Sequence, residues 1–429
     1  MLSKIRASIG DNTLLKIGSI NAVSVVLQIL GGLITSKLIA IYLGERGMAL
    51  LGYLRNFMTS AQAAGNLGLS NGIVKYVATG DEKSHPLSNL LSTAVIVSLV
   101  ATLIVSLVLY IGAAYFNTQV FGEGTEYMYV FKLLAIALPF ITLNGILLAI
   151  INGQSAYKKV VNIQIFSNLL GLAIAVLSIV YYGVQGALFA LVISPAVILV
   201  ITLIALGKQG DVLRSILWSN FDTAALRKLG SYTLMALFSM IVLPLVYIAI
   251  RKEIGDGAGY WDAMTRISSY YVKFVATLMT LYILPQLAKA TTDASFRKEI
   301  FGFYKTVLPL FGVGLVVIYL LRDFIVGLIF TEDFIPMTHL FKWQLLGDFF
   351  KVASIVIGYQ IIATNNLKLF LITEIISLVV IYCSGIYLVR EFGYEGASMG
   401  HCFSYFIHLL VLLFIFRKPL FGKTIAASE

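Results

Sequence analysis

The sequence predicts an all-α polytopic membrane protein, with twelve transmembrane helices in two six-helix lobes. The composition, the number of apolar spans and an internal duplication lead to this fold class. Of the 429 residues, 59% are hydrophobic and only 12% are charged, and the mean hydropathy is +0.91. A soluble domain carries about 25% charged residues. Because so few charges cannot cover a surface in water, a soluble enzyme, a disordered protein and a secreted disulfide scaffold are excluded.

Twelve stretches are long and apolar enough to cross a bilayer, which takes about 20 residues of helix. Two of them, the second and the eighth, are the weakest by hydropathy because they contain charges. The N-terminal segment lacks a cleavage site after a short apolar core, so we expect an uncleaved first span. The predicted spans are 14–40, 48–78, 87–112, 127–151, 160–182, 185–207, 224–250, 259–284, 302–321, 337–363, 368–389 and 396–416.

The basic residues predict the orientation. The net charge is +10, and basic residues gather in cytoplasmic loops, so we expect no nucleic-acid partner. If the loops alternate between the two sides, 19 Lys and Arg residues fall on the side that holds both termini. Five fall on the other side: Arg46, Arg251, Lys252, Arg322 and Arg390. We therefore expect both termini in the cytoplasm.

A duplication relates the two halves of the chain. Short motifs recur at a nearly constant offset of 210 to 211 residues. We expect an N-lobe at 1–207, a cytoplasmic connection at 208–223 and a C-lobe at 224–429. Because each repeat has an even number of spans, the lobes should be related by a pseudo-twofold axis along the membrane normal. Transporters with such repeats bind substrate near the midplane between the halves. The matches are Gly44-Glu45 with Gly255-Asp256, Arg55 with Arg266, Phe131-Lys132 with Phe341-Lys342, Lys158 with Lys368, and Gly183–Ala187 with Gly393–Ala397.

Two stripes of polar residues in the first two spans predict a water-filled cavity. A charge at the bilayer centre is costly, so it should face protein or water. The alternative for the Ser, Thr and single Asn residues is hydrogen bonding between helices, which is common in bundles. The stripe of the second span is Arg55, Thr59, Gln62, Asn66 and Ser70, and that of the first is Asn21, Ser24, Gln28 and Thr35.

Charges in the C-terminal half extend this prediction. Asp262, Arg266 and Lys273 share a face of the eighth span, where Asp262 and Arg266 could form an i,i+4 ion pair. Asp348 and Lys351 in the tenth span could neutralise each other. Glu374 is either a proton or cation site or a partner for Lys368. Lys37, Lys132 and Lys342 lie near span ends, where a Lys side chain can extend to the interface.

The deep charges are net positive, which favours an anionic substrate, since Arg can bind phosphate oxygens bidentately. We expect neither a cofactor nor a metal. The sequence has no Walker loop, HExxH or CxxC motif, and Cys383 and Cys402 lie in apolar runs. An ATPase or hydrolase activity is therefore not expected, and the chain is predicted not to be an enzyme.

Three stretches give the chain a family resemblance: Tyr232–Leu237, Leu243–Tyr247 and Trp343–Val352. They resemble bacterial polysaccharide flippases of the Wzx type, in the multidrug/oligosaccharidyl-lipid/polysaccharide exporter superfamily. The resemblance implies twelve spans in two lobes in the bacterial inner membrane. It also implies a substrate: an undecaprenyl-pyrophosphate-linked O-antigen or enterobacterial common-antigen unit, moved from the cytoplasmic to the periplasmic leaflet. Cationic cavity residues would contact the pyrophosphate. Arg55, Asp348 and Lys351 fall in matching motifs, whereas Arg266 does not.

The resemblance also suggests an energy source and partners. Moving two phosphate charges outward follows an inside-negative potential, worth about 2.3 kcal/mol per charge per 100 mV. Asp348, Asp262 and Glu374 are the membrane carboxylates that could couple H⁺ or Na⁺. We expect a monomer that works beside a polysaccharide polymerase and a chain-length regulator. The alternatives are a multidrug or small-molecule antiporter, which would favour an acidic cavity, and a membrane glycosyltransferase or polymerase, which would usually need a larger soluble domain.

Overall fold

A computed structural model describes residues 13–79, 87–123, 126–154, 156–207, 221–279, 287, 292–364 and 366–422. Every regular element in these ranges is a helix. The chain forms two compact units. Unit 1 comprises residues 1–43 and 50–245, and unit 2 comprises residues 44–49 and 246–429. The predicted connection at 208–223 lies almost entirely outside the described residues.

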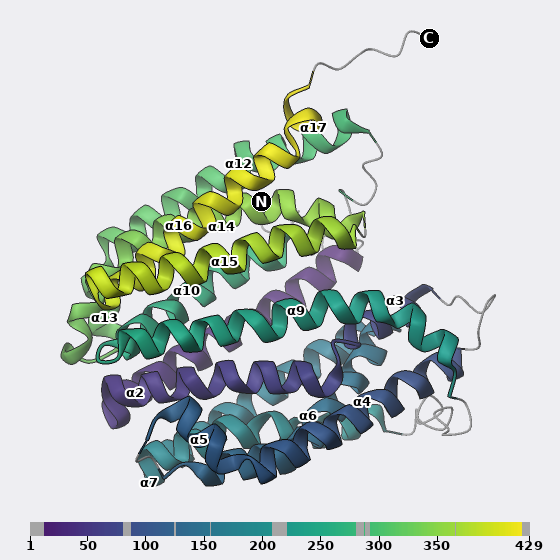
Figure 1. The fold of residues 1–429 in the computed structure, drawn as a ribbon, viewed down its shortest axis with the longest axis horizontal. Helices are drawn as coiled ribbons and strands as arrows, with labels where there is room; N and C mark the ends of the chain where they lie inside the picture. The colour runs from purple at the N-terminus through teal and green to yellow at the C-terminus, as the bar shows by residue number, and fades with distance from the viewer. Residues whose placement is uncertain are drawn as a thin grey trace, which may run out of the picture. The chain divides into compact units, whose positions relative to one another are not determined.

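Unit 1 is built around long helices (Figure 1). The central helix α6 packs against α4 and α7, and α3 also packs on α6. The helices are α2 (Thr13–Asn66), α3 (Ser70–Thr79), α4 (Leu87–Ile111), α5 (Ala113–Phe121), α6 (Met128–Gly153), α7 (Tyr157–Leu206) and the first part of α9 (Thr223–Ile254).

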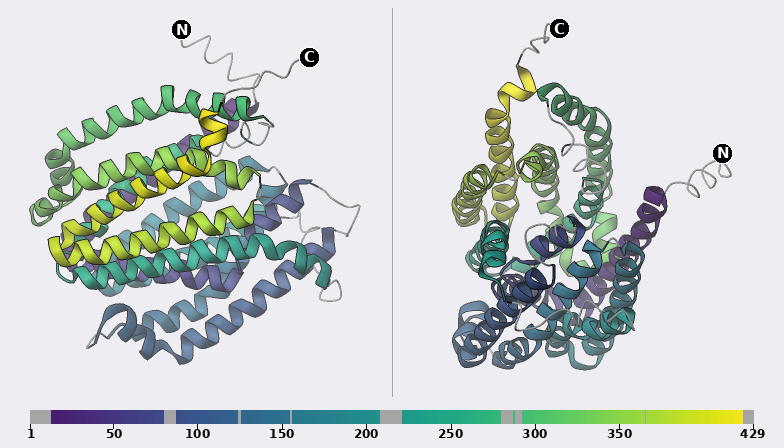
Figure 2. Two further views of the ribbon diagram at one scale, coloured as in Figure 1. Left: turned by 45° about the horizontal axis from the view of Figure 1, so that its top comes forward. Right: turned by 90° about the vertical axis from the view of Figure 1, so that its right-hand side faces the viewer.

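Unit 2 contains the remaining helices. α16 packs against both α14 and α15, and α15 and α16 run side by side in both views of Figure 2. After the end of α9 come α10 (Ala258–Leu278), α12 (Asp293–Leu320), α13 (Arg322–Ile329), the 3₁₀ helix η3 (Glu332–Leu340), α14 (Phe341–Ala363), α15 (Leu367–Phe392), α16 (Tyr394–Ile415) and α17 (Arg417–Phe421).

The helices have the lengths that a membrane requires. Seven in the described ranges are both long and apolar enough to cross a bilayer. Two of these, α2 and α7, are bent by non-helical glycines, Gly44 and Gly183, and so each supplies two spans. With α9, α10 and α14, which are more polar, the described residues hold twelve helical segments of sufficient length. The predicted fold class is confirmed.

The duplication is visible in the backbone. Gly44 and Gly255 have φ of 65° and 62°, and Gly183 and Gly393 have φ of 55° and 60°. Only glycine adopts this left-handed region without strain. Three residues after Gly183 and Gly393, a Cβ on Gly186 or Gly396 would overlap a backbone carbonyl of the preceding helix, at Ser178 and Leu388 respectively. Both repeats therefore use one glycine to turn the chain and a second to bring the next helix close.

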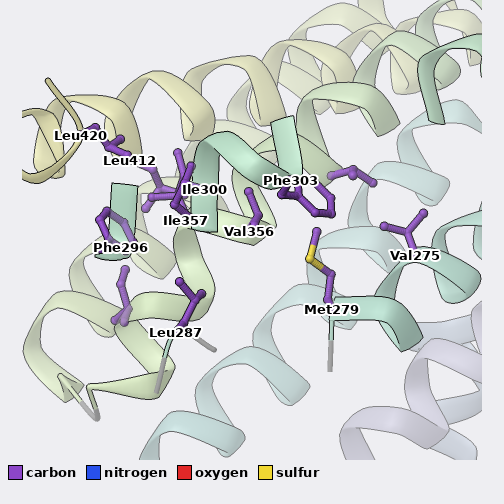
Figure 3. Close-up of a cluster of buried hydrophobic side chains, with 12 residues drawn as sticks. Val275, Met279, Leu287, Phe296, Ile300, Phe303, Val356, Ile357, Leu412 and Leu420 are labelled. Atoms are coloured by element: carbon purple, nitrogen blue, oxygen red, sulfur yellow. The ribbon is translucent and has the colours of Figure 1, made fainter. Parts of the chain in front are cut away.

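Each unit has its own apolar core. In unit 1, Leu91, Ala94 and Ile146 belong to a cluster on α3, α4 and α6. In unit 2, a larger cluster joins α10, α12, α14 and α16. Figure 3 shows Met279 and Phe303 of this cluster pointing toward one another. Large apolar side chains are also exposed along the helices, such as Leu107 of α4 at 60%. A lipid solvent explains this exposure, since hydrocarbon does not penalise apolar surface.

The second span ends earlier than the sequence predicts. We expected it to run to residue 78, but α2 ends at Asn66 and the chain breaks at Leu67, which has φ of 51°. The Asn66 side-chain oxygen accepts a 2.7 Å hydrogen bond from the Gly68 N–H. Asn favours such turns because its side chain bonds the backbone two residues on. Ser70 therefore begins α3 and does not continue the α2 stripe.

Candidate functional site

A buried polar cluster in unit 2 surrounds the carboxylate of Asp348, which is 0% exposed. Ser268 and Tyr271 of α10 donate to its Oδ2 at 2.6 and 2.5 Å. Its Oδ1 lies 3.0 Å from Nε2 of His401 on α16. Gln344, one turn earlier on α14, lies 3.4 Å from the same oxygen. We call Asp348, Ser268, Tyr271, Gln344 and His401 the Asp348 cluster.

The cluster places side chains from three helices on one carboxylate. A buried charge is tolerated only when it is paired and hydrogen-bonded. Here α10 contributes hydroxyl donors and α16 contributes an imidazole, so the site depends on how α10, α14 and α16 pack together. These pairs of helices are in contact.

Lys351 lies one turn beyond Asp348 on α14, and it is half-buried. Its Nζ is 5.1 Å from the centroid of the Tyr405 ring, a cation–π distance. Tyr405 is in turn hydrogen-bonded to Tyr247 of α9. The predicted neutralisation of Asp348 by Lys351 is therefore not its main interaction: the short contacts of Asp348 are with the cluster.

The possible ion pair between Asp262 and Arg266 is not formed, because Asp262 pairs with Arg251 instead. The Asp262 carboxylate lies 2.6 Å from Nη2 of Arg251, and the side chains of both residues are almost fully buried. The Arg251 guanidinium also lies 5.3 Å from the Trp261 ring. The pairing joins the end of α9 to the start of α10 across a tight turn, which the helical i,i+4 rule does not consider. Asp262 thus belongs to a buried ion pair in this structure.

Arg266 and Lys273 occupy more open positions on α10. Arg266 Nη1 contacts the sulfur of Met48 at 3.5 Å. Met48 belongs to the segment 44–49, which is part of unit 2 although it follows the first span. In the same segment, the Glu45 carboxylate accepts a hydrogen bond from the Gly259 N–H at the start of α10. Lys273 is exposed.

In unit 1, the stripe on α2 is half-buried. Arg55, Gln62 and Asn66 are each partly exposed, whereas the neighbouring Leu54, Met58 and Ala61 are buried. Gln28 in the first span is exposed. The side chain of Asn21 lies outside the described residues.

Other polar residues of unit 1 follow the alternative of interhelical hydrogen bonding. Thr102 of α4 bonds Thr142 of α6 at 3.1 Å, and Thr202 of α7 donates to Asn144 of α6 at 2.6 Å. Ser24 of the first span lies 3.4 Å from Gln164 of α7. These contacts join neighbouring helices of unit 1, and they include Ser24, a member of the predicted polar stripes.

Four members of the Asp348 cluster were not predicted from the sequence: Ser268, Tyr271, Gln344 and His401. A histidine in an apolar span was the available signal, since such residues are rare in bilayers. Among the described residues no group of three or more His, Cys, Asp or Glu is placed to hold a metal. The stretch Gly68–Gly72 fits a GxSxG pattern, but it joins two helices and lacks the strand of a nucleophile elbow.

These features define a class: a multi-pass helical membrane protein whose two units carry polar groups within apolar spans. The sequence profile of the polysaccharide biosynthesis protein family matches residues 14–291. The chain belongs to this family.

Similar proteins extend the comparison. Lipid III flippases of Escherichia coli (strain K12) and Shigella flexneri are 29% identical over 401 residues, covering 92% of this chain and 96% of each relative. Among solved structures, an inward-facing multidrug resistance MATE transporter of the MOP superfamily aligns with a TM-score of 0.76 and 14% identity, covering 94% of this chain and 96% of that one. The lipid II flippase MurJ, in an inward closed conformation, aligns with a TM-score of 0.74 and 16% identity, covering 92% and 87%. The fold is that of MOP-superfamily transporters.

Proposed function

We propose that this chain is a flippase that moves a lipid-linked oligosaccharide between the leaflets of the bacterial inner membrane. The full-length similarity to lipid III flippases carries the proposal, since it covers 92% of the chain. The family match and the transporter fold agree with it. The relatives are named as flippases, and the proposed activity is transport without a catalytic step.

The finer proposal concerns the substrate. We propose an undecaprenyl-pyrophosphate that carries an O-antigen or common-antigen unit, moved by alternating access between lobes at 1–207 and 224–429. Arg55, Arg266, Lys273 and Lys351 would bind the pyrophosphate, because cations in a partly dehydrated cavity attract phosphate strongly. All four side chains are half-buried or exposed, so a ligand could reach them. Gln62, Asn66, Asn21 and Gln28 would hydrogen-bond the sugars.

We further propose that Asp348 is the coupling carboxylate among the three predicted. Asp262 is committed to Arg251. Glu374 is half-buried on α15. Asp348 instead joins three helices, through His401 of α16 and the hydroxyls of Ser268 and Tyr271 on α10. A proton or Na⁺ arriving at Asp348 would change the bonds that hold α10 and α16 to α14, and so could bias the conformation of unit 2.

Two assignments of assembly and orientation complete the proposal. Both termini are cytoplasmic, in line with the distribution of basic residues. The protein works as a monomer beside a polysaccharide polymerase and a chain-length regulator, because a flipped repeat unit must next be polymerised to a set length.

Complementation tests the function. The chain is expressed in Escherichia coli that lacks its lipid III flippase, or in an O-antigen flippase mutant, and surface polysaccharide is measured. We expect one of the two polysaccharides to return to the surface and the corresponding lipid-linked intermediate to fall. Restoration of drug resistance with neither polysaccharide would favour a multidrug antiporter of the same fold and would contradict the proposal.

A further inference from the structure

An apolar groove runs between α12 and α14 in unit 2, and no residue of the Asp348 cluster lines it. Its volume is about 660 Å³. Leu315 and Leu345 are buried in it, whereas Val316 and Leu346 are exposed along it. Its lining extends from Gly312 to Tyr319 on α12 and from Lys342 to Phe349 on α14.

One end of the groove is basic. The exposed Lys342 belongs to its lining, and its ammonium lies 5.0 Å from the Trp343 ring. At the same end of α12, the Arg322 guanidinium lies 4.5 Å from the ring of Tyr319, another lining residue. Asp323 is 3.9 Å from Arg322 and 70% exposed, at the outer limit of an ion pair. The cations of Lys342 and Arg322, each beside an aromatic ring, thus lie at this end of the apolar groove.

The other end is closed by packing. A Cβ on Gly312 would lie 3.3 Å from the Phe349 ring, so these two residues meet at the deep end. The lining runs from residue 312 to 319 on α12 and from 342 to 349 on α14. Each stretch corresponds to about 10 Å along the helix axis. The hydrocarbon core of a bilayer is about 30 Å thick. The groove therefore ends within a single leaflet.

We propose that this groove binds one acyl chain of an anionic phospholipid, with the lipid phosphate at Lys342 and Arg322. The two cations complement a negative headgroup. The short groove fits a chain that ends within one leaflet better than a long polyprenyl chain. Bulk lipid would cover any exposed apolar face without preference, whereas a groove with a basic end should select an anionic lipid. The site is independent of the proposed flippase function.

The duplication supplies a matched control. Lys132 is the counterpart of Lys342 in the first repeat, and it also lies over an aromatic ring, 5.7 Å from that of Tyr110. Lys132 is outside the groove lining. Lys132→Gln removes the same charge from an equivalent end of a span without touching the groove.

Trp343 reports on the site because it stands beside Lys342. The protein is placed in phosphatidylcholine nanodiscs that contain increasing, matched fractions of either brominated phosphatidylglycerol or brominated phosphatidylcholine. Trp343 emission is taken as the difference between the protein and its Trp343→Phe variant. We expect the brominated phosphatidylglycerol to quench Trp343 at lower concentration, by roughly fivefold for each cation near the surface.

The variants locate the preference. Lys342→Gln and Arg322→Gln should each lower it by about fivefold, and Lys132→Gln should leave it unchanged. Val316→Phe, at an exposed lining position, should reduce quenching by both lipids. Equal quenching by the two lipids in the unaltered protein, an equal loss in Lys132→Gln, or full quenching in Val316→Phe would overturn the proposal. Displacement of the brominated lipid by undecaprenyl phosphate at lower concentration than by unlabelled phosphatidylglycerol would also overturn it.

Discussion

A carboxylate buried in a protein costs several kcal/mol unless nearby groups compensate its charge. At Asp348 the compensation comes from Ser268, Tyr271 and His401, which lie on two other helices. The residue thus ties together the α10, α14 and α16 segments of unit 2. A change in the charge of Asp348 is therefore the most direct way in which a bound ion could alter the contacts between these helices.

Neutralising Asp348 should abolish the coupling of transport to an ion gradient without preventing the protein from folding. Asp348→Asn keeps the size and most hydrogen-bonding capacity of the side chain. We expect normal membrane abundance but a flipping rate that no longer responds to an imposed H⁺ or Na⁺ gradient, measured in vesicles. Asp262→Asn is the control, because it leaves Arg251 buried without its carboxylate and should lower the melting temperature. A full gradient response in Asp348→Asn would exclude Asp348 as the coupling site.

Arg55 is the predicted phosphate ligand of unit 1. Arg55→Ala should lower flipping roughly tenfold to a hundredfold, because a hydrogen bond to a charged group is worth about 1.5–3 kcal/mol. Arg55→Lys should restore part of the activity, since it keeps the charge but loses the planar fork. Arg266→Ala should cost less, because Lys273 remains on α10. Surface polysaccharide at matched protein levels is the measurement. Full activity of Arg55→Ala would assign Arg55 to packing.

The sequence predicted which charges lie within spans but not their partners. Helical spacing suggested Asp262 with Arg266, and Asp348 with Lys351. Asp262 instead pairs with Arg251 across a turn, and Asp348 with residues up to 80 positions away. Spacing along one helix can find i,i+4 neighbours only. Contacts between helices depend on packing, which a single sequence does not display.

At the scale of helices, glycines set how closely neighbours pack. α15 and α16 approach at Gly385 and Gly400, where a Cβ on Gly400 would lie 2.8 Å from the Gly385 Cα. Small residues allow such approaches between helices in membranes, where packing replaces the hydrophobic effect. Glycines with positive φ have a different role: Gly44, Gly183, Gly255 and Gly393 bend the chain between one span and the next.

Gly400→Ala should therefore destabilise the protein. The added methyl group meets backbone, which cannot rotate away, and overpacking of this kind costs about 1–3 kcal/mol. The matched control is Gly314→Ala, a helical glycine of α12 whose Cβ would meet nothing within 4 Å. Melting temperatures in detergent should fall for Gly400→Ala and stay level or rise for Gly314→Ala. Equal melting temperatures would show that the α15–α16 crossing relaxes freely.

Hydropathy predicted the spans well because a bilayer demands about 20 apolar residues from each. It failed at the end of the second span, where the sequence stays apolar through Leu67 and Leu69. The break there depends on a left-handed Leu67 and on the Asn66 side chain. A local hydrogen bond of this kind leaves no mark on a hydropathy profile.

At the scale of the whole molecule, an even number of spans predicts that both termini lie on one side of the membrane. The distribution of basic residues predicts that this side is the cytoplasm. Fusions of a reporter at Gly210 and at Glu429 should be inactive when the reporter works only in the periplasm. A fusion at Arg390, on the opposite side, should be active. Periplasmic activity at Gly210 or Glu429 would reverse the orientation and with it the direction of transport.

Transport of a lipid-linked oligosaccharide by the protein alone is the central claim. The purified chain is reconstituted into liposomes with a fluorescent undecaprenyl-pyrophosphate oligosaccharide, and a membrane-impermeant quencher measures the label in the outer leaflet over time. The account predicts exchange between leaflets that exceeds the rate in protein-free liposomes and is slowed by Arg55→Ala at equal protein content. Exchange no faster than in protein-free liposomes, with an inside-negative potential or an ion gradient applied, would contradict it.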